Sequence, residues 1–278
     1  MTAEPDCDLA LAQLLTPAAF GCPDFLRQHT EFGGHPTALL HGGAGPRLLL
    51  VHGGVASGAL SFFPVLPALA QRWHVLAPDL PGCGLTPPLG APTLARQIAW
   101  FDALLAATSP DLVLAASIGG ALALHTWASA RRSRPPLIVC GAPALQPFAP
   151  PLRARLPMLA FALAPSRLTL WALARATHAR IWDSPALRQF VDATLFAMRR
   201  PDGRQFLRDL QPCLDPVPAA RLLAAGPVRG IWGARDPFVP VSGLPAWLPC
   251  TRIAAAGHYP FFDQPAAFLA ALGQAAAP

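Results

Sequence analysis

Short apolar runs alternate with longer amphipathic segments from residue 47 to the end of the chain. Strands that are buried on both faces of a sheet read as continuous apolar runs, and the helices between them carry apolar residues at helical spacing. The pattern therefore predicts an α/β fold, in which helices flank a mostly parallel sheet. The predicted strands span residues 48–51, 74–77, 112–116, 137–140, 228–232 and 251–254, and the predicted helices span 58–71, 93–107, 118–131 and 265–272.

The alternation stops between residues 144 and 215. This segment has no strand pattern, only helical stretches that proline and glycine interrupt, at 152–163, 167–182, 185–199 and 204–210. We interpret it as an all-helical cap inserted into one core domain, whose two parts are residues 1–143 and 216–278. Upstream, the glycine-rich segment 32–45 predicts an antiparallel hairpin at the sheet edge. Residues 1–29 match no pattern.

Length and composition exclude several classes of protein. The chain has 278 residues, of which 53% are hydrophobic and 13% charged, so it can bury a large core and is not disordered. No apolar run approaches the roughly 20 residues of a membrane-spanning helix, so we expect no span. The six Cys form no C-x-x-C pair, which predicts neither a zinc site nor a disulfide framework. The N-terminus carries Glu4, Asp6 and Asp8 where a secretory signal is basic, so we expect a cytoplasmic location.

Positive charge is concentrated in the predicted cap. The chain has a net charge of +6, and all 21 basic residues are Arg. No cluster combines Arg with exposed aromatic residues, so nucleic-acid binding is not predicted. A basic cap would attract acidic substrates, such as an acidic acyl carrier protein, unless Arg merely replaces Lys as the solvated surface cation. The cap holds five Asp and ten Arg, which are Arg153, Arg155, Arg167, Arg175, Arg180, Arg188, Arg199, Arg200, Arg204 and Arg208.

Ser117 stands between a predicted strand and a predicted helix. This is the context of a nucleophile elbow, a sharp turn that exposes the serine hydroxyl. The turn needs small residues around it, and Ala115, Gly119 and Gly120 supply them. The alternative is a serine that only caps the helix.

A glycine-rich loop follows the first parallel strand. Gly53 and Gly54 let the backbone turn and direct N–H groups toward the same edge of the sheet. We expect the N–H groups of Ile118 and Gly54, with Val55 as the substitute, to form an oxyanion hole. We expect His52 to hold this loop.

Asp236 and His258 each follow a further predicted strand. The carboxyl ends of parallel strands meet at one edge of a sheet, where ligands bind. The same edge carries Ser117 and Gly54. The chain order Ser, Asp, His is also the order that this kind of fold requires. Together these features predict a Ser-His-Asp site.

From the predicted hairpin onward, the chain resembles the α/β-hydrolase superfamily, in the branch that carries a helical cap after the sixth strand. The resemblance rests on the features above, on segment 78–84, which is similar to the family's D-x-P-G-x-G turn, and on a Gly-His pair ahead of Phe262. We expect Asp79 in that turn to be structural. Ala115 and Ala116 depart from the family pattern.

The resemblance implies a serine esterase, similar to carboxylesterases and to the methyl ester esterases that act on a carrier-bound pimeloyl chain. Ser117 would attack a carboxylic ester or thioester with an apolar acyl group, His258 would act as the base and Asp236 would orient it. No cofactor or metal is implied. The residues that we expect to contact the substrate are Val55, Met158, Phe161, Leu168, Trp171, Phe196 and Tyr259.

Three other functions remain open: a C–C bond hydrolase, a proline iminopeptidase and a non-enzymatic ligand receptor. Epoxide hydrolases and dehalogenases of the family attack with Asp, so Ser117 disfavours them. A C–C bond hydrolase usually has Trp after the catalytic His, where Tyr259 stands. A proline iminopeptidase needs acidic residues near the site, and the cap offers few. A non-enzymatic ligand receptor does not need a base-activated serine.

Overall fold

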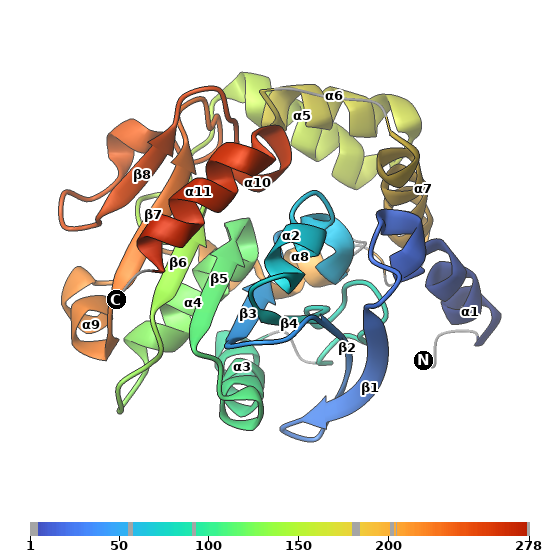
Figure 1. Cartoon of the computed structure of the whole chain (residues 1–278). Coiled ribbons are helices and arrows are strands. Elements are labelled where there is room, and N and C mark those ends of the chain that lie inside the picture. The colour runs from blue at the N-terminus through green and yellow to red at the C-terminus, as the bar shows by residue number, and fades with distance from the viewer. Residues whose placement is uncertain are drawn as a thin grey trace.

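The computed structural model describes residues 5–54, 58–90, 93–179, 184–200, 203 and 205–276. Eight strands form one sheet in the order β1-β2-β4-β3-β5-β6-β7-β8 (Figure 1). Their bounds are β1 Leu26–Phe32, β2 His35–Gly42, β3 Arg47–Val51, β4 His74–Pro78, β5 Leu112–Ala116, β6 Leu137–Cys140, β7 Val228–Gly233 and β8 Cys250–Ile253.

Helices pack on and around this sheet. The α-helices are α1 Pro5–Leu14, α2 Leu66–Ala70, α3 Leu94–Thr108, α4 Ser117–Ala128, α5 Leu152–Leu163, α6 Arg167–Thr177, α7 Pro185–Arg199, α8 Gln205–Asp209, α9 Ala219–Ala225, α10 Pro260–Asp263 and α11 Pro265–Ala275. Short 3₁₀ helices are η1 Pro17–Phe20, η2 Gly58–Phe62, η3 Gln211–Leu214 and η4 Val241–Gly243. In the described part of the chain, no helix has the length and apolarity needed to cross a membrane.

The strands from β3 to β8 confirm the predicted parallel sheet. β4, β3, β5, β6, β7 and β8 pair in parallel, whereas β1 and β2 are antiparallel. Every residue of β5 and β6 is buried, as expected of central strands. The loops that follow β3, β5, β7 and β8 therefore meet at one edge (Figure 1).

The hairpin begins earlier than its glycines suggest. Strand β1 begins within residues 1–29, to which no element was assigned, because it is polar and mostly exposed at the sheet edge. Gly33 and Gly34 form the turn with φ of 60° and 76°, which glycine adopts without strain. The predicted helix 58–71 is also wrong, since Pro64 separates η2 from α2.

The N-terminal segment has a structural role that the sequence pattern did not indicate. Helix α1 and the turn η1 both pack against α7. Leu11, Leu15 and Phe20 are almost fully buried there. Residues 5–20 therefore support helix α7.

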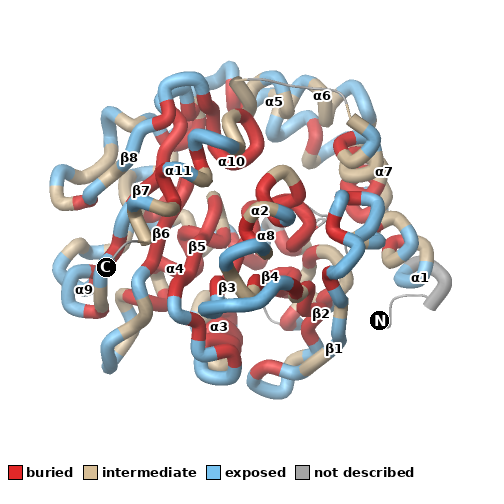
Figure 2. Tube along the Cα trace, in the orientation of Figure 1, coloured by how far each residue is buried: buried red, intermediate tan, exposed pale blue. Residues whose placement is uncertain are grey.

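Between β6 and β7 the described chain is helical and contains no strand. Helices α5, α6 and α7 lie over the carboxyl edge of the sheet, consistent with a cap (Figure 1). Helix α6 ends at Thr177, earlier than predicted. The boundaries of the cap at residues 144 and 215 remain a prediction. Burial is concentrated in the sheet and α4, while the outer cap is exposed (Figure 2).

Candidate active site

Ser117 lies at the sharp turn between β5 and α4. Its φ is +49°, a left-handed conformation that few side chains adopt. A Cβ at position 119 would lie 2.1 Å from the carbonyl oxygen of His52, and one at position 120 would lie 2.7 Å from the Cβ of Ala142. Gly119 and Gly120 thus let the new helix pack directly against the loops that follow β3 and β6, and Ala115 is fully buried beneath the turn.

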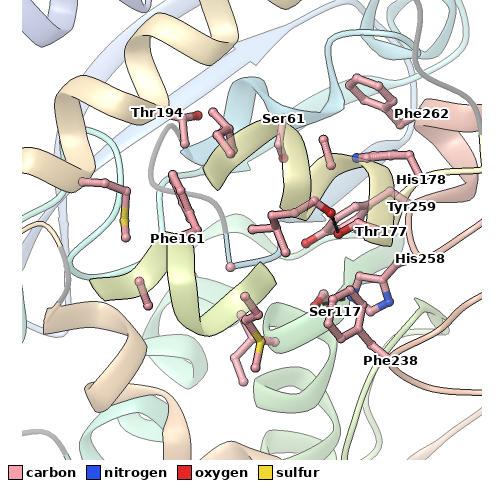
Figure 3. A pocket seen from close by; sticks show the side chains of 18 of the residues that line it. Ser61, Ser117, Phe161, Thr177, His178, Thr194, Phe238, His258, Tyr259 and Phe262 are labelled. Atoms are coloured by element: carbon pink, nitrogen blue, oxygen red, sulfur yellow. Dashed lines mark hydrogen bonds between the residues drawn. The ribbon is translucent and has the colours of Figure 1, made fainter. Parts of the chain in front are cut away.

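The structure brings Ser117, His258 and Asp236 together. Nε2 of His258 lies 2.8 Å from Oγ of Ser117, and Nδ1 lies 2.9 and 3.0 Å from the two carboxylate oxygens of Asp236. An ionised carboxylate only accepts hydrogen bonds, so Nδ1 carries the proton and Nε2 accepts from the serine hydroxyl. Figure 3 shows His258 beside Ser117.

Backbone groups fix the Asp236 carboxylate in turn. Its Oδ1 accepts hydrogen bonds from the N–H groups of Phe238 at 2.9 Å and Val239 at 3.0 Å. The Asp loop and the His loop touch, because a Cβ on Gly233 would lie 1.9 Å from the carbonyl oxygen of Gly257. These contacts hold the Asp236 carboxylate in one orientation, and the residue is only 5% exposed.

His52 holds the glycine-rich loop, as expected. Its Nε2 accepts from the N–H of Leu80 at 2.8 Å, so Nδ1 carries the proton and donates to the carbonyl of Gly53 at 2.6 Å. Burial lowers the pKa of the imidazole below its usual value, although Asp79 and the Gly53 carbonyl oppose this shift. The neutral ring joins this loop to the turn after β4.

Two predicted oxyanion-hole residues lie next to each other at the cavity. Gly54 and Ile118 both line the cavity, and a Cβ at position 54 would lie 3.4 Å from a methyl group of Ile118. The N–H of Ile118 belongs to the first turn of α4, where helix geometry provides no intrahelical acceptor. Val55 lies outside the described residues.

Tyr259 places a phenol at the nucleophile. Its hydroxyl group forms a side-chain hydrogen bond with Ser117 and fills the space that a side chain at Gly53 would occupy. Burial raises the pKa of the phenol to about 12, against the opposing effect of the hydrogen bond with Ser117. Tyr259 therefore stays a neutral phenol over the physiological range.

Asp79 is structural, as expected. Its two oxygens accept from the N–H groups of Ala59 at 2.7 Å and Leu85 at 2.9 Å, and Arg27 lies 3.5 Å away. Gly84 has a positive φ and lies so close that a Cβ would meet the carboxylate at 2.2 Å. The carboxylate organises the loop and does not face the cavity.

Asp263 is a site residue that the sequence interpretation missed. Its buried carboxylate accepts from the N–H groups of Gly257 at 2.6 Å and Ala179 at 2.8 Å, and it lies 3.0 Å from Nδ1 of His178. The N–H of His258 donates in addition to the carbonyl of Thr177 at 2.9 Å. The end of α6 is thus tied directly to the loop that carries the histidine.

A largely apolar cavity of about 570 Å³ opens beside Ser117 (Figure 3). Met158, Phe161, Trp171 and Tyr259 line it, together with residues that were not predicted. Leu168 does not line it and is 80% exposed, so the expectation for Leu168 is wrong. Phe196 packs against the buried core and is also not among the lining residues. The unpredicted aromatic lining residues are Phe148, Phe190, Phe206, Phe238, Phe261 and Phe262.

The described side chains contain no group of three or more His, Cys, Asp or Glu arranged to hold a metal ion. The five Cys whose side chains are described are free thiols, and four of them are buried. Burial raises the pKa of Cys22 to about 11, so this thiol stays protonated at neutral pH.

A model of the alpha/beta hydrolase family matches residues 48–272. The chain therefore belongs to this family, and its Ser-His-Asp arrangement is that of a serine hydrolase.

Three known proteins illustrate the range of similarity. A pimeloyl-[acyl-carrier protein] methyl ester esterase of Xanthomonas oryzae is 34% identical over 105 residues, which cover 36% of this chain and 39% of the esterase. A membrane phospholipase A, described as a bacterial virulence factor, superposes with a TM-score of 0.77 at 20% identity, over 97% of this chain and 91% of its own. A carboxylesterase of Bacillus subtilis gives a TM-score of 0.74 at 17% identity, over 97% and 98%. The two structural matches show the fold alone.

Proposed function

We propose that this protein hydrolyses carboxylic esters or thioesters with an apolar acyl group, through an acyl-enzyme on Ser117. The observation that carries the proposal is the chain of hydrogen bonds from Asp236 through His258 to Ser117, at the floor of an apolar cavity. A serine hydroxyl is a poor nucleophile near neutral pH until a base removes its proton.

The reaction runs in two halves. Ser117 Oγ attacks the acyl carbon while its proton moves to Nε2 of His258, and the carbonyl electron pair moves onto oxygen. The N–H groups of Ile118 and Gly54 stabilise this oxyanion. Collapse expels the alcohol or thiol, which takes the proton from His258. Water then attacks the acyl-enzyme by the same route and releases the acid.

The shape and chemistry of the cavity support an apolar acyl group. The lining is dominated by aliphatic and aromatic side chains, with Ser117 and His258 among its few polar members. A volume of about 570 Å³ is typical of a small-molecule site. Among the alternatives, a C–C hydrolase is disfavoured by Tyr259, and an iminopeptidase by the absence of Asp or Glu from the cavity lining in the described residues.

The basic cap makes an acidic acyl carrier protein a second candidate for the substrate's carrier. Xanthomonas esterases that this chain partly matches act, by name, on a carrier-bound ester. Some of the charge is neutralised within the molecule, however. Arg200 pairs with Asp8 at 2.9 Å, and Arg167 pairs with Asp192. Small-molecule esters therefore remain the first proposal.

The test uses purified wild-type protein and Ser117→Ala on a chain-length series of p-nitrophenyl and coenzyme A esters. We expect hydrolysis by the wild type and a loss of about 10⁴- to 10⁶-fold in the variant. A fluorophosphonate should label Ser117 alone. Wild-type activity in Ser117→Ala would overturn the mechanism, and a carrier-bound ester cleaved much faster than the free ester would favour the second candidate.

A further inference from the structure

Helix α5 is apolar on two opposite sides. Ala154 and Phe161 are buried toward the molecule, as in any amphipathic helix. Leu152, Leu156 and Leu159 follow one another at intervals of four and three residues and are 54 to 65% exposed. This spacing places them on one outward face, and Leu163 continues it. We call these four residues the leucine stripe.

The leucine stripe is not ordinary surface scatter. Six of the nine large hydrophobic side chains that are exposed in the described chain lie between residues 152 and 168. A helix that is apolar all round is normally buried, and contiguous exposed apolar patches mark interaction sites. Figure 2 shows α5 at the edge of the molecule beside α6, and the four leucines of the stripe are each more than half exposed.

The charges beside the stripe are of one sign. Arg153 and Arg155 belong to the same helix and are both exposed. No Asp or Glu occurs between Asp111 and Asp183, so no acidic side chain of this stretch offsets them. An apolar face flanked by Arg, on a helix at the surface, is the pattern of helices that lie in the interface of an anionic membrane.

The stripe is continuous with the catalytic cavity. Leu159 is 54% exposed and yet lines the cavity, and its neighbour Met158 also does both. The same cavity reaches Ser117. An acyl chain could therefore pass from an apolar phase at α5 to the nucleophile along apolar side chains. A rigid protein partner would need a groove that matches the exposed face of a helix, whereas lipid adapts to it.

We propose that α5 docks this protein on an anionic lipid surface through the leucine stripe and its flanking Arg153 and Arg155, so that its substrates are esters with long apolar chains drawn from that surface. The choice of substrate rests on the proposed function, but the docking does not. Hydrocarbon burial of the leucines would supply salt-independent binding, and the arginines a salt-sensitive part.

Co-sedimentation with vesicles tests the docking without any catalytic readout. Vesicles of phosphatidylcholine alone and of phosphatidylcholine with phosphatidylglycerol are mixed with the full chain over a salt series. We expect binding to the anionic vesicles, weakened as salt rises. The double variant Leu152→Gln, Leu156→Gln should bind about tenfold more weakly. The double variant Arg153→Gln, Arg155→Gln should lose most of the salt dependence.

A matched control pair lies elsewhere on the molecule. Leu26 on β1 and Leu223 on α9 are 63% and 58% exposed. The double variant Leu26→Gln, Leu223→Gln should bind vesicles within twofold of wild type. Equal binding by the stripe and control variants, or no wild-type binding to anionic vesicles, would overturn the proposal. So would a wild-type dimer that the stripe variant converts to monomer, since a second copy would then cover α5.

Activity assays distinguish the proposed docking of α5 on lipid from the proposed ester hydrolysis at Ser117. Ser117→Ala should bind vesicles as the wild type does. The stripe variant should lose hydrolysis of long-chain esters in vesicles about tenfold and keep hydrolysis of a soluble short ester. If the wild type hydrolyses no ester, the proposed function fails while vesicle binding still decides the docking. If the stripe variant selectively loses a carrier-bound ester and keeps vesicle binding, α5 recognises a carrier protein and the docking proposal fails.

Discussion

The active site has a floor, made of the loops that follow β3, β4, β5, β7 and β8, and a roof, made of helices α5, α6 and α7. Different forces hold the two. On the floor, directional hydrogen bonds orient the side chains of His52, Asp79 and Asp236. In the roof, α5, α6 and α7 present mainly apolar side chains to the cavity. Hydrogen bonds tolerate little displacement, whereas apolar packing tolerates exchange of similar volumes. The chemistry should therefore be sensitive to single-atom changes, and the substrate preference should be adjustable.

The largest effect is expected on the floor, for Asp236→Asn. The amide oxygen can still accept from the backbone of residues 238 and 239, so the loop should keep its shape. The amide nitrogen, however, would face Nδ1 of His258 and favour the wrong tautomer. We expect kcat to fall about 10⁴-fold, with a thermal midpoint close to that of the wild type. A fall of less than tenfold would show that another group orients the histidine.

The next largest effect is expected where floor and roof join, for Asp263→Asn. The buried carboxylate accepts from Gly257, Ala179 and His178, and an amide would turn one donor toward these donors. We expect the free energy of unfolding to fall by about 2 to 4 kcal/mol and kcat to fall with it. Denaturant unfolding and steady-state kinetics measure the two changes.

The control for this junction is Asp192→Asn in the roof. Asp192 pairs with Arg167 at the surface, where both side chains are largely exposed. Exposed pairs contribute about 0 to 1 kcal/mol, so stability should barely change. Equal effects of Asp192→Asn and Asp263→Asn would mean that the junction is no more important than any surface ion pair.

The floor could be predicted from the sequence because its residues follow strands. Ser117, Asp236 and His258 follow strands β5, β7 and β8, and parallel pairing brings the ends of those strands to one edge. Asp263 could not be found in this way, because it is a lone acid within α10 and belongs to no motif. One cue was present: an acidic residue in a strongly apolar segment needs hydrogen-bond donors nearby.

The roof was predicted less well for a physical reason. Its helices carry apolar residues on more than one side, so periodicity does not say which side faces the cavity. Phe161 does face it, whereas Leu168 faces solvent. The polar strand β1 and the helix α1 were missed because neither has a strong apolar period. Their positions depend on contacts with distant segments, β2 and α7.

These two roof residues provide the third prediction. Phe161→Ala enlarges the cavity, so the preference among p-nitrophenyl esters should shift to longer acyl chains. We expect kcat/KM for short esters to fall about tenfold, because a short acyl chain would lose apolar contacts with the Phe161 ring. Leu168→Ala is the matched control and should leave the chain-length profile unchanged. The same shift in both variants would mean that the cavity does not select chain length.

The smallest effect, and the one that probes both regions at once, concerns the ionisation of Tyr259. It is the single tyrosine of the chain, so phenolate absorbance reports on it alone. Burial raises its pKa to about 12 from 10. The folded state thus favours the neutral phenol, and its contribution to stability is complete below pH 10 and lost as the pH rises toward 12. Absorbance should therefore change near pH 12 in the native chain and near pH 10 after unfolding. Since the hydrogen bond with Ser117 opposes the rise, Ser117→Ala should move the native midpoint further up. A native midpoint near pH 10 would mean that solvent reaches the phenol, and that the roof does not close over the nucleophile.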